Sequence, residues 1–395
     1  MTWKTTPIGT VIRTSQYGLS LLADPAGGIP IVGMKDIQDG RVRIDPEVRV
    51  TLTDEDAEPY LLKDGDILLN RTNSPDLVGK AGIYRGDGKA IFASYLVRLE
   101  LDQTQVDPDF IIQILASEGG QRRIRQLATR AVSQANLNPT TFKNHFLIPI
   151  PALKEQVGIR DVLMAWDTAI ETTERLIAAK EAYIGAMTAR IYRRSPGWSR
   201  YRLGDFLQET KVLHGHGDYV IGSVGKNGIK PRDEVYSKNL TSNHERNLLV
   251  KPGWLCFGLA SDCMAFGVNS TNQTYSVSPA YRTFQINGAD PRFFEGYLRV
   301  FNGRLSKRFL ITSARQGKAI DFEGLFNTEC YFPSREEQQQ IASAVLLMRE
   351  ELDHLRQLRE ALKRQKRGLM QKLLTGEWRV PLPDTESTVK EAAPC

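Results

Sequence analysis

Residues 149–163 read PIPALKEQVGIRDVL, and residues 332–346 read FPSREEQQQIASAVL. The two stretches share a proline, a Glu-Gln pair and an isoleucine in the same order, so that Gln156 matches Gln338 and Ile159 matches Ile341. They are separated by about half of the 395 residues of the chain. This spacing predicts that one helix occurs twice in an internally duplicated chain.

The same register extends on either side of these stretches. Each half has an Asp-Pro pair ahead of the repeated helix, and each has a tryptophan five residues before an apolar residue and a glycine. The repeating unit is therefore much longer than the roughly 20 to 50 residues of a solenoid repeat. We expect two similar globular domains, each followed by a similar helix. The matching pairs are Trp3 and Trp198, Asp107 and Asp290, and Leu137 and Ile320.

The composition is that of a folded protein rather than a disordered or fibrous one. The chain has 41% hydrophobic and 25% charged residues, and its length suits two domains of roughly 100 to 200 residues each. Its most apolar stretch, residues 253–268, contains Asp262 and is shorter than the ~20 residues of a membrane span. The four cysteines form no C-x-x-C pair, as is typical of a reducing compartment. We therefore expect a cytoplasmic protein with no membrane contact.

Short apolar runs separated by turn residues predict strands in both halves, without a regular alternation of strands and helices. In the first half we expect strands within 29–34, 67–69, 81–84 and 91–101 and a helical stretch over 110–127; in the second half, strands within 249–257 and 281–286 and a helix over 291–309. This pattern indicates an α+β fold. The expected organisation is domain one at 1–150, a first spacer helix at 151–195, domain two at 196–332, a second spacer helix at 333–378 and a flexible tail at 379–395.

Both spacer helices have the seam of a left-handed coiled coil, with residues spaced alternately by three and four. In the first helix the seam runs from Leu163 to Ile191. In the second it runs from Ile341 to Leu355, and we expect it to continue after a shift of phase through Leu358, Leu362 and Leu369. Because a tandem duplicate supplies its own partner, we expect the two helices to pair antiparallel within one chain, with an approximate two-fold; pairing with a second chain is the alternative.

The search for catalytic motifs finds none with the required spacing. A phosphate-binding G-x-x-x-x-G-K-[ST] loop is absent, and Asn138-Pro139-Thr140-Thr141 lacks the aromatic residue that amino-methyltransferases place against a flipped base. His214 and His216 could share a metal ion, but a polar turn around Gly215 explains them better. We therefore predict no catalytic, cofactor-binding or metal-binding residues.

Polar and cationic loops recur in both halves instead. A net charge of +6 permits binding to a polyanion, and Arg, Lys, Gln and Asn are the side chains that neutralise phosphates and read base edges. Constant helices with different loops suit a protein that reads two different short DNA words on duplex DNA. The candidate DNA-binding residues are Arg71, Asn73, Ser74, Lys80, Arg130, Ser133, Gln134 and Asn136 in domain one, and Lys226, Asn227, Lys230, Arg315, Gln316 and Lys318 in domain two.

The chain also resembles a known family, the specificity subunits of type I restriction-modification systems. The resemblance covers nearly the whole chain. It rests on the two Pro-to-Glu-Gln-to-Ile stretches that begin at Pro151 and Pro333, on GLMQKLLTG at 368–376, and on DILLNRTNS at 66–74 followed by VGK at 78–80.

The resemblance implies two target recognition domains held apart by two helices, which also dock two modification subunits. In such systems S-adenosylmethionine, ATP and Mg are bound by the partner modification and restriction subunits, so this chain would supply DNA recognition alone. Two other functions remain open: a stand-alone DNA methyltransferase or nuclease with an unrecognised motif, and a coiled-coil scaffold with two protein-binding domains.

Overall fold

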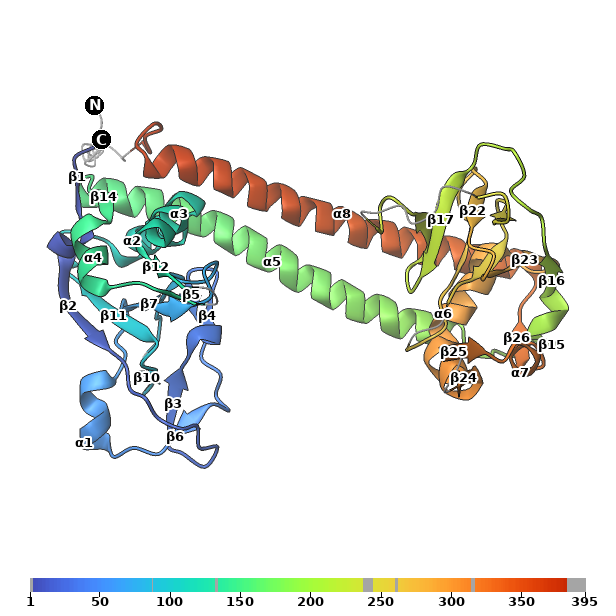
Figure 1. Cartoon of the computed structure of the whole chain (residues 1–395), viewed down its shortest axis with the longest axis horizontal. Helices are drawn as coiled ribbons and strands as arrows, with labels where there is room; N and C mark the ends of the chain where they lie inside the picture. Colours follow the sequence, from blue (N-terminus) through green and yellow to red (C-terminus); the bar gives the residue numbers. More distant parts are fainter. Residues whose placement is uncertain are drawn as a thin grey trace, which may run out of the picture. The chain divides into compact units, whose positions relative to one another are not determined.

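The computed structural model describes residues 3–86, 88–131, 134–236, 244–259, 262–313 and 317–381 (Figure 1). The chain forms two compact units. The first consists of Met1–Glu174 with Gln357–Cys395, and the second of Arg175–Arg356. Each unit therefore contains one α+β domain, part of the long helix α5 (Leu153–Ile191) and part of the long helix α8 (Arg335–Leu374). The α+β class predicted from the sequence is confirmed.

Domain one is built around a six-stranded sheet with the order β2-β11-β7-β9-β5-β4. Three smaller sheets, β1-β14, β10-β3-β6 and β12-β13-β8, flank it. The strands are β1 Thr5–Pro7, β2 Ile12–Tyr17, β3 Ile29–Val32, β4 Ile37–Gln38, β5 Arg41–Val42, β6 Arg49–Val50, β7 Ile67–Asn70, β8 Thr72–Asn73, β9 Ala81–Ile83, β10 Ile91–Phe92, β11 Leu96–Leu101, β12 Thr129–Arg130, β13 Ala135–Asn136 and β14 Leu147–Pro149.

The helices of domain one begin at residues that can cap them. Asp107 accepts the Phe110 N–H and Pro108 occupies the first turn of α2 (Pro108–Ala116). The sequence pattern predicts a helical stretch over 110–127, which the structure forms as two helices. The backbone breaks at Ser117, whose hydroxyl accepts the Gly120 N–H and caps α3 (Glu118–Leu127), because serine competes for backbone hydrogen bonds and favours helix starts. The short helices α1 (Asp54–Ala57) and α4 (Pro139–His145) complete the domain.

Domain two has two four-stranded sheets, β16-β23-β20-β21 and β18-β17-β22-β19. The predicted helix over 291–309 is α6 (Pro291–Phe309), which Asp290 caps, and α7 spans Phe322–Phe326. The predicted strand within 249–257 is two strands, separated by a turn at Pro252-Gly253. The strands are β15 Ser199–Arg202, β16 Leu207–Thr210, β17 Val220–Gly225, β18 Gly228–Pro231, β19 Leu248–Val250, β20 Leu255–Phe257, β21 Phe266–Val268, β22 Tyr275–Val277, β23 Arg282–Ile286, β24 Leu310–Ser313, β25 Gly317–Ile320 and β26 Glu329–Phe332.

The duplication is visible in the contacts by which each domain meets the start of its helix. In the first unit the buried Gln156 accepts the Asp107 N–H at 2.9 Å and donates to the Pro151 carbonyl at 2.9 Å. In the second unit the buried Gln338 accepts the Asp290 N–H at 2.8 Å and donates to the Pro333 carbonyl at 2.9 Å. The two matching glutamines therefore make equivalent contacts. Each links the residue that caps a domain helix to the proline before a spacer helix.

The matching tryptophans repeat in the same way. Trp3 donates to Glu155 and Trp198 donates to Glu337, each at 3.3 Å. The first strand of each domain also pairs with its last strand, β1 with β14 and β15 with β26. Each domain therefore closes on itself just before its spacer helix begins.

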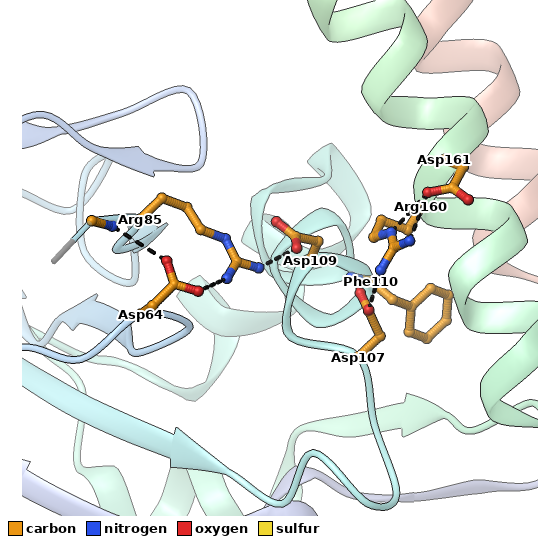
Figure 2. Close-up of polar contacts among 8 residues, drawn as sticks. Asp64, Arg85, Asp107, Asp109, Phe110, Arg160 and Asp161 are labelled. Carbon is orange, nitrogen blue, oxygen red and sulfur yellow. Dashed lines mark hydrogen bonds and ion pairs between the residues drawn. The ribbon is translucent and has the colours of Figure 1, made fainter.

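An ion pair between the domain and the spacer helix reinforces this junction in the first unit. Figure 2 shows Arg160 of α5 between Asp107 and Asp161, with its guanidinium 2.7 Å from the Asp107 carboxylate and 2.8 Å from Asp161. A second arginine in the same view, Arg85, bonds to Asp64 and to Asp109 of α2. The position that matches Arg160 is Ala342, so α8 offers no cation there, and Asp290, which matches Asp107, lies 3.6 Å from Arg292 of its own helix α6. The junction of the second unit packs aromatic rings, among them Phe206, Phe293 and Phe332.

We expect Arg160→Met to lower the free energy of unfolding by about 2 kcal/mol, the usual size of a hydrogen bond to a charged group. The Asp107 side chain is only 10% exposed, so its carboxylate would lose a partner without gaining full hydration. Urea denaturation measures the change. The matched control is Arg364→Met, because Arg364 is exposed on α8 and makes no ion pair within the described part of the chain. An equal effect of the two changes would contradict the role of Arg160.

Helices α5 and α8 pair antiparallel within each unit, as predicted (Figure 1). In the first unit the N-terminal part of α5 meets the C-terminal part of α8, where Asp167 pairs with Lys366 at 2.6 Å and Glu174 with Lys363 at 2.7 Å. In the second unit the other two ends meet: Ile177 and Ile184 pack with Leu352, and Lys180 pairs with Glu351 at 2.5 Å. No helix in the described ranges is both long and apolar enough to cross a bilayer.

The predicted change of phase in α8 is wrong. Leu358 is 48% exposed and faces away from the seam, which continues in an unbroken alternation of threes and fours through Leu355, Arg359, Leu362 and Lys366 to Leu373. The search for apolar residues missed this because two seam positions are cationic. Lys366 is only 15% exposed: its aliphatic stem packs while its ammonium group reaches Asp167.

Candidate nucleic-acid interface

Two loops predicted to bind DNA in domain one belong to one small sheet. Strand β13 pairs antiparallel with β8, placing Ala135 opposite Asn73 and Asn136 opposite Thr72. It also pairs with β12, placing Arg130 opposite Ala135. The stretch that begins at Asn70 and the stretch that begins at Thr129 are thus hydrogen-bonded neighbours, although about 60 residues separate them in the sequence.

This sheet borders an open depression of about 470 Å³. Four of the predicted residues, Arg71, Arg130, Gln134 and Asn136, line it. Arg130, Gln134 and Asn136 are exposed, so their donors and acceptors are available to a ligand. The other lining residues, Tyr17, Thr129, Ala131, Ala135, Leu137, Asn138 and Pro139, were not predicted.

Arg71 is held in place more firmly than Arg130, the other cationic residue that lines the depression. Its N–H donates to the Tyr95 carbonyl at 3.0 Å, and its carbonyl accepts the Leu137 N–H at 2.7 Å. Its guanidinium lies 4.8 Å from the centre of the Tyr17 ring, and its Nε donates to the Thr72 hydroxyl at 3.3 Å. No acidic side chain within the described ranges forms an ion pair with it. Its charge is therefore available to an anion or to an acceptor on a base.

The remaining predicted residues of this stretch stand at a turn beside the depression. Asn73 Oδ1 accepts the Ser74 N–H at 2.7 Å, and the Ser74 carbonyl accepts the Leu77 N–H at 3.0 Å. The turn ends at Gly79, whose φ of +78° and close approach to Ile124 of α3 require glycine. Lys80 follows it and is half-buried. Asn73, Ser74 and Lys80 are thus not among the residues that line the depression. Ser133 lies outside the described residues.

Sequence reasoning missed Tyr17 as a residue that lines the depression. Tyr17 is the last residue of β2, and Arg71 directly follows β7. The two residues meet because β2 and β7 both pair with β11, and this strand order cannot be predicted from the sequence near either residue. Asn70 is fully buried at the end of β7, and neither polar atom of its side chain has a hydrogen-bond partner among the described residues.

In domain two the predicted residues fall in two places. Lys226 and Asn227 form the two-residue tip of the hairpin between β17 and β18, and Lys230 lies on β18; all three are exposed. Gly228 follows the tip with a φ of +97°, in the left-handed region that favours glycine. Arg299 of α6 donates to the Lys226 carbonyl at 3.0 Å and fixes the tip.

The second place is the hairpin of β24 and β25, which pairs Thr312 with Lys318. Lys318 lies 3.4 Å from Asp262, so its charge is partly neutralised. Two predicted residues of this hairpin, Arg315 and Gln316, lie outside the described residues.

A separate depression in domain two, of about 470 Å³, shows how an arginine can be made unavailable. Arg282 donates to both carboxylate oxygens of Glu209, at 2.9 and 2.6 Å, and stacks 4.1 Å from the Phe322 ring centre. The hydrogen bond from Arg282 lowers the pKa of Glu209 below its usual value, so the carboxylate stays charged. Arg282 is therefore occupied by its own neighbour.

The two histidines considered as metal ligands have other surroundings. His214 Nδ1 lies 2.7 Å from the Ser276 hydroxyl, and its ring packs edge-on against Tyr219. His216 is exposed in the following turn. Within the residues that the structure describes, no three acidic, histidine or cysteine side chains are grouped as metal ligands would be.

Comparisons with known proteins agree on one family. Residues 2–181 match the model of the type I restriction modification DNA specificity domain. The putative type I restriction enzyme MjaX specificity subunit of Methanocaldococcus jannaschii is 23% identical over 422 residues, covering 96% of this chain and 94% of that protein. The type I restriction enzyme StySPI specificity subunit of Salmonella potsdam is 29% identical over 160 residues, covering 40% and 34%.

Solved structures show the same fold. The S subunit of a type I restriction-modification system from M. genitalium has a TM-score of 0.57 at 14% identity, covering 94% of this chain and 96% of that one. A chain from a structure that describes complex assembly and conformational transition of a type I system has a TM-score of 0.56 at 16% identity, covering 95% and 98%. Residues 2–181 thus match the DNA specificity domain of type I restriction-modification systems, and the chain as a whole is similar in sequence and in fold to specificity subunits of such systems.

Proposed function

We propose that this chain supplies DNA sequence choice to a type I restriction-modification complex by reading a bipartite duplex target, one short word per domain. The observation that carries the proposal is the depression of domain one, where four predicted polar and cationic side chains meet on a rigid sheet. The exposed hairpin tip with Lys226 and Asn227 is the corresponding candidate in domain two. Because the two domains are similar but carry different loops, each would select a different DNA word.

The proposal includes partner subunits that carry the chemistry. Two modification subunits would bind S-adenosylmethionine, and restriction subunits would use ATP and Mg, while this chain would have no catalytic residue of its own. Both spacer helices offer apolar side chains for docking. Examples in the second unit are Leu176, Tyr183, Leu346 and Leu347, which are 50, 52, 44 and 65% exposed. Such a complex would work in the cytoplasm, where its DNA lies.

Selection from a random duplex library tests the proposal directly. We expect the purified full chain to enrich two short words separated by an unspecified gap of constant length. Enrichment of one continuous word would contradict the bipartite reading. A coiled-coil scaffold would enrich no word at all, so the same experiment tests that alternative.

The enzymatic alternative requires a separate measurement. We expect no transfer of labelled methyl groups from S-adenosylmethionine to DNA when the chain is incubated alone, and transfer when modification subunits are added. Methyl transfer or strand cleavage by the chain alone would overturn the non-catalytic assignment.

A further inference from the structure

We propose that Arg71 reads a guanine in the half-site of domain one. The proposal rests on the proposed function and makes it specific: it names one residue and one base. It follows from how the guanidinium is held, from which of its donors are left free and from what surrounds it.

The backbone of Arg71 is fixed on both sides. Its N–H bonds to Tyr95, in the loop before β11, and its carbonyl bonds to Leu137, next to β13. It therefore connects the six-stranded sheet to the small sheet that borders the depression. The main chain at this position moves little, so the direction of the side chain is well defined. Hydrogen bonds to a base edge require a well-defined direction, whereas contact with a phosphate does not.

The side chain is held in turn by two neighbours. The guanidinium lies 4.8 Å from the centre of the Tyr17 ring, where stacking on the ring face is favourable. Its Nε donates to the Thr72 hydroxyl at 3.3 Å, and that hydroxyl donates to Asn136 at 3.5 Å. Thr72 is buried, so this contact is shielded from water. Together the two contacts limit both the tilt and the rotation of the guanidinium plane.

These contacts leave the two terminal nitrogens of the guanidinium without a partner among the described residues. Nη1 and Nη2 form a fork of two parallel donors. Guanine presents two acceptors, O6 and N7, at matching spacing in the major groove, and paired hydrogen bonds from arginine to these atoms are the commonest specific contact to DNA. Adenine presents an acceptor beside a donor, so the same fork would leave one hydrogen bond unmade.

Two other arginines show what distinguishes Arg71. Arg282 is also stacked on a ring, but Glu209 binds its Nε and Nη2, so its two terminal nitrogens are not both free. Arg130 lines the same depression as Arg71, but it is exposed on the strand β12 and its side chain makes no hydrogen bond or ion pair within the described ranges. An unrestrained cation suits a phosphate, whose contact carries no sequence information. Arg71 alone of these three is both restrained and available.

The test is selection from a duplex library with the full chain and two matched variants, Arg71→Lys and Arg130→Lys. Both keep the charge and lose the fork. We expect the wild-type chain to select guanine at one position of one half-site. We expect Arg71→Lys to lower that preference roughly 5- to 150-fold, the discrimination expected of one bidentate pair, and to leave the other half-site unchanged. Arg130→Lys should leave every base preference unchanged.

Three outcomes would overturn the proposal. Arg71→Lys could retain the wild-type preference at every position. It could weaken binding to all sequences equally, as a phosphate anchor would. It could also change the preference for a base other than guanine. These outcomes leave two selected words and so leave the proposed function standing, whereas a wild-type chain that selects nothing would remove both.

A second variant guards against a change in folding. Thr72→Val removes the hydroxyl that holds Nε and keeps Arg71 itself. We expect it to weaken the same guanine preference without moving it to another position, and thermal denaturation of all three variants shows whether each is folded. If Thr72→Val is folded and leaves the guanine preference at its wild-type value, restraint by Thr72 is not part of the reading.

Discussion

Gln156→Leu should destabilise the first unit more than any other single substitution considered for it. The Gln156 side chain is fully buried and satisfies three backbone groups: the N–H of Asp107 at 2.9 Å, the carbonyl of Gln105 at 3.0 Å and the carbonyl of Pro151 at 2.9 Å. Leucine has a similar volume but no polar atom. Each buried group left without a partner costs about 1 to 3 kcal/mol, so we expect a loss of about 3 kcal/mol or more.

Calorimetry or urea denaturation of the full chain measures this loss. The chain has two compact units, so we expect the transition of the first unit to move while that of the second stays close to its wild-type position. Gln338→Leu should show the reverse, with a smaller loss of about 2 kcal/mol because Gln338 satisfies two backbone groups. The matched control is Gln339→Leu, at an exposed position of the same helix.

If the first unit of Gln156→Leu unfolds as it does in the wild-type chain, the repeated glutamine does not hold the domain to its helix. The same variant also bears on function. If Gln156 fixes domain one on its helix, Gln156→Leu should weaken selection of the first word more than selection of the second.

The second large effect concerns the spacer helices. Adding one heptad to each, near the ion pair of Glu174 with Lys363, keeps the seam in phase and lengthens both helices by about 10 Å at ~1.5 Å per residue. We expect the unspecified gap of the selected target to widen by at most about three base pairs, since each adds ~3.4 Å. The two words themselves should not change.

The control is a heptad added to α5 alone. After this insertion the pairs on its two sides, Asp167 with Lys366 and Lys180 with Glu351, can no longer both form, so it should lower stability and weaken selection. An unchanged gap in the doubly lengthened chain would refute the role of the helices as a spacer. A library that holds the two words at every gap length from zero to twelve or so resolves the shift.

Much of the molecule follows from local patterns in the sequence. The duplicated stretches around Gln156 and Gln338 give the two long helices, because a repeat of three and four residues can bury one stripe only as a helix. Asp290 followed by Pro291 marks the start of α6, since both residues act within the first helical turn. Short apolar runs with turns between them give the α+β class.

The depression of domain one required the tertiary structure. Arg71, Arg130, Gln134 and Asn136 could be listed from their chemistry, but nothing local places them around one space. They meet because β13 pairs with β8 on one side and β12 on the other. The register of non-local strands depends on the whole sheet and leaves no periodic signal in either segment.

The same distinction explains the errors. Apolar residues alone predict that the seam of α8 passes through Leu358. The carboxylate that lets Lys366 occupy the seam belongs to Asp167 on the other helix, so the sequence of α8 does not reveal it. The sequence by itself determined the duplication, the helices and the kinds of side chain that face DNA in the proposed function. Only the tertiary structure decided which of them are neighbours, because packing brings together groups that the chain order keeps far apart.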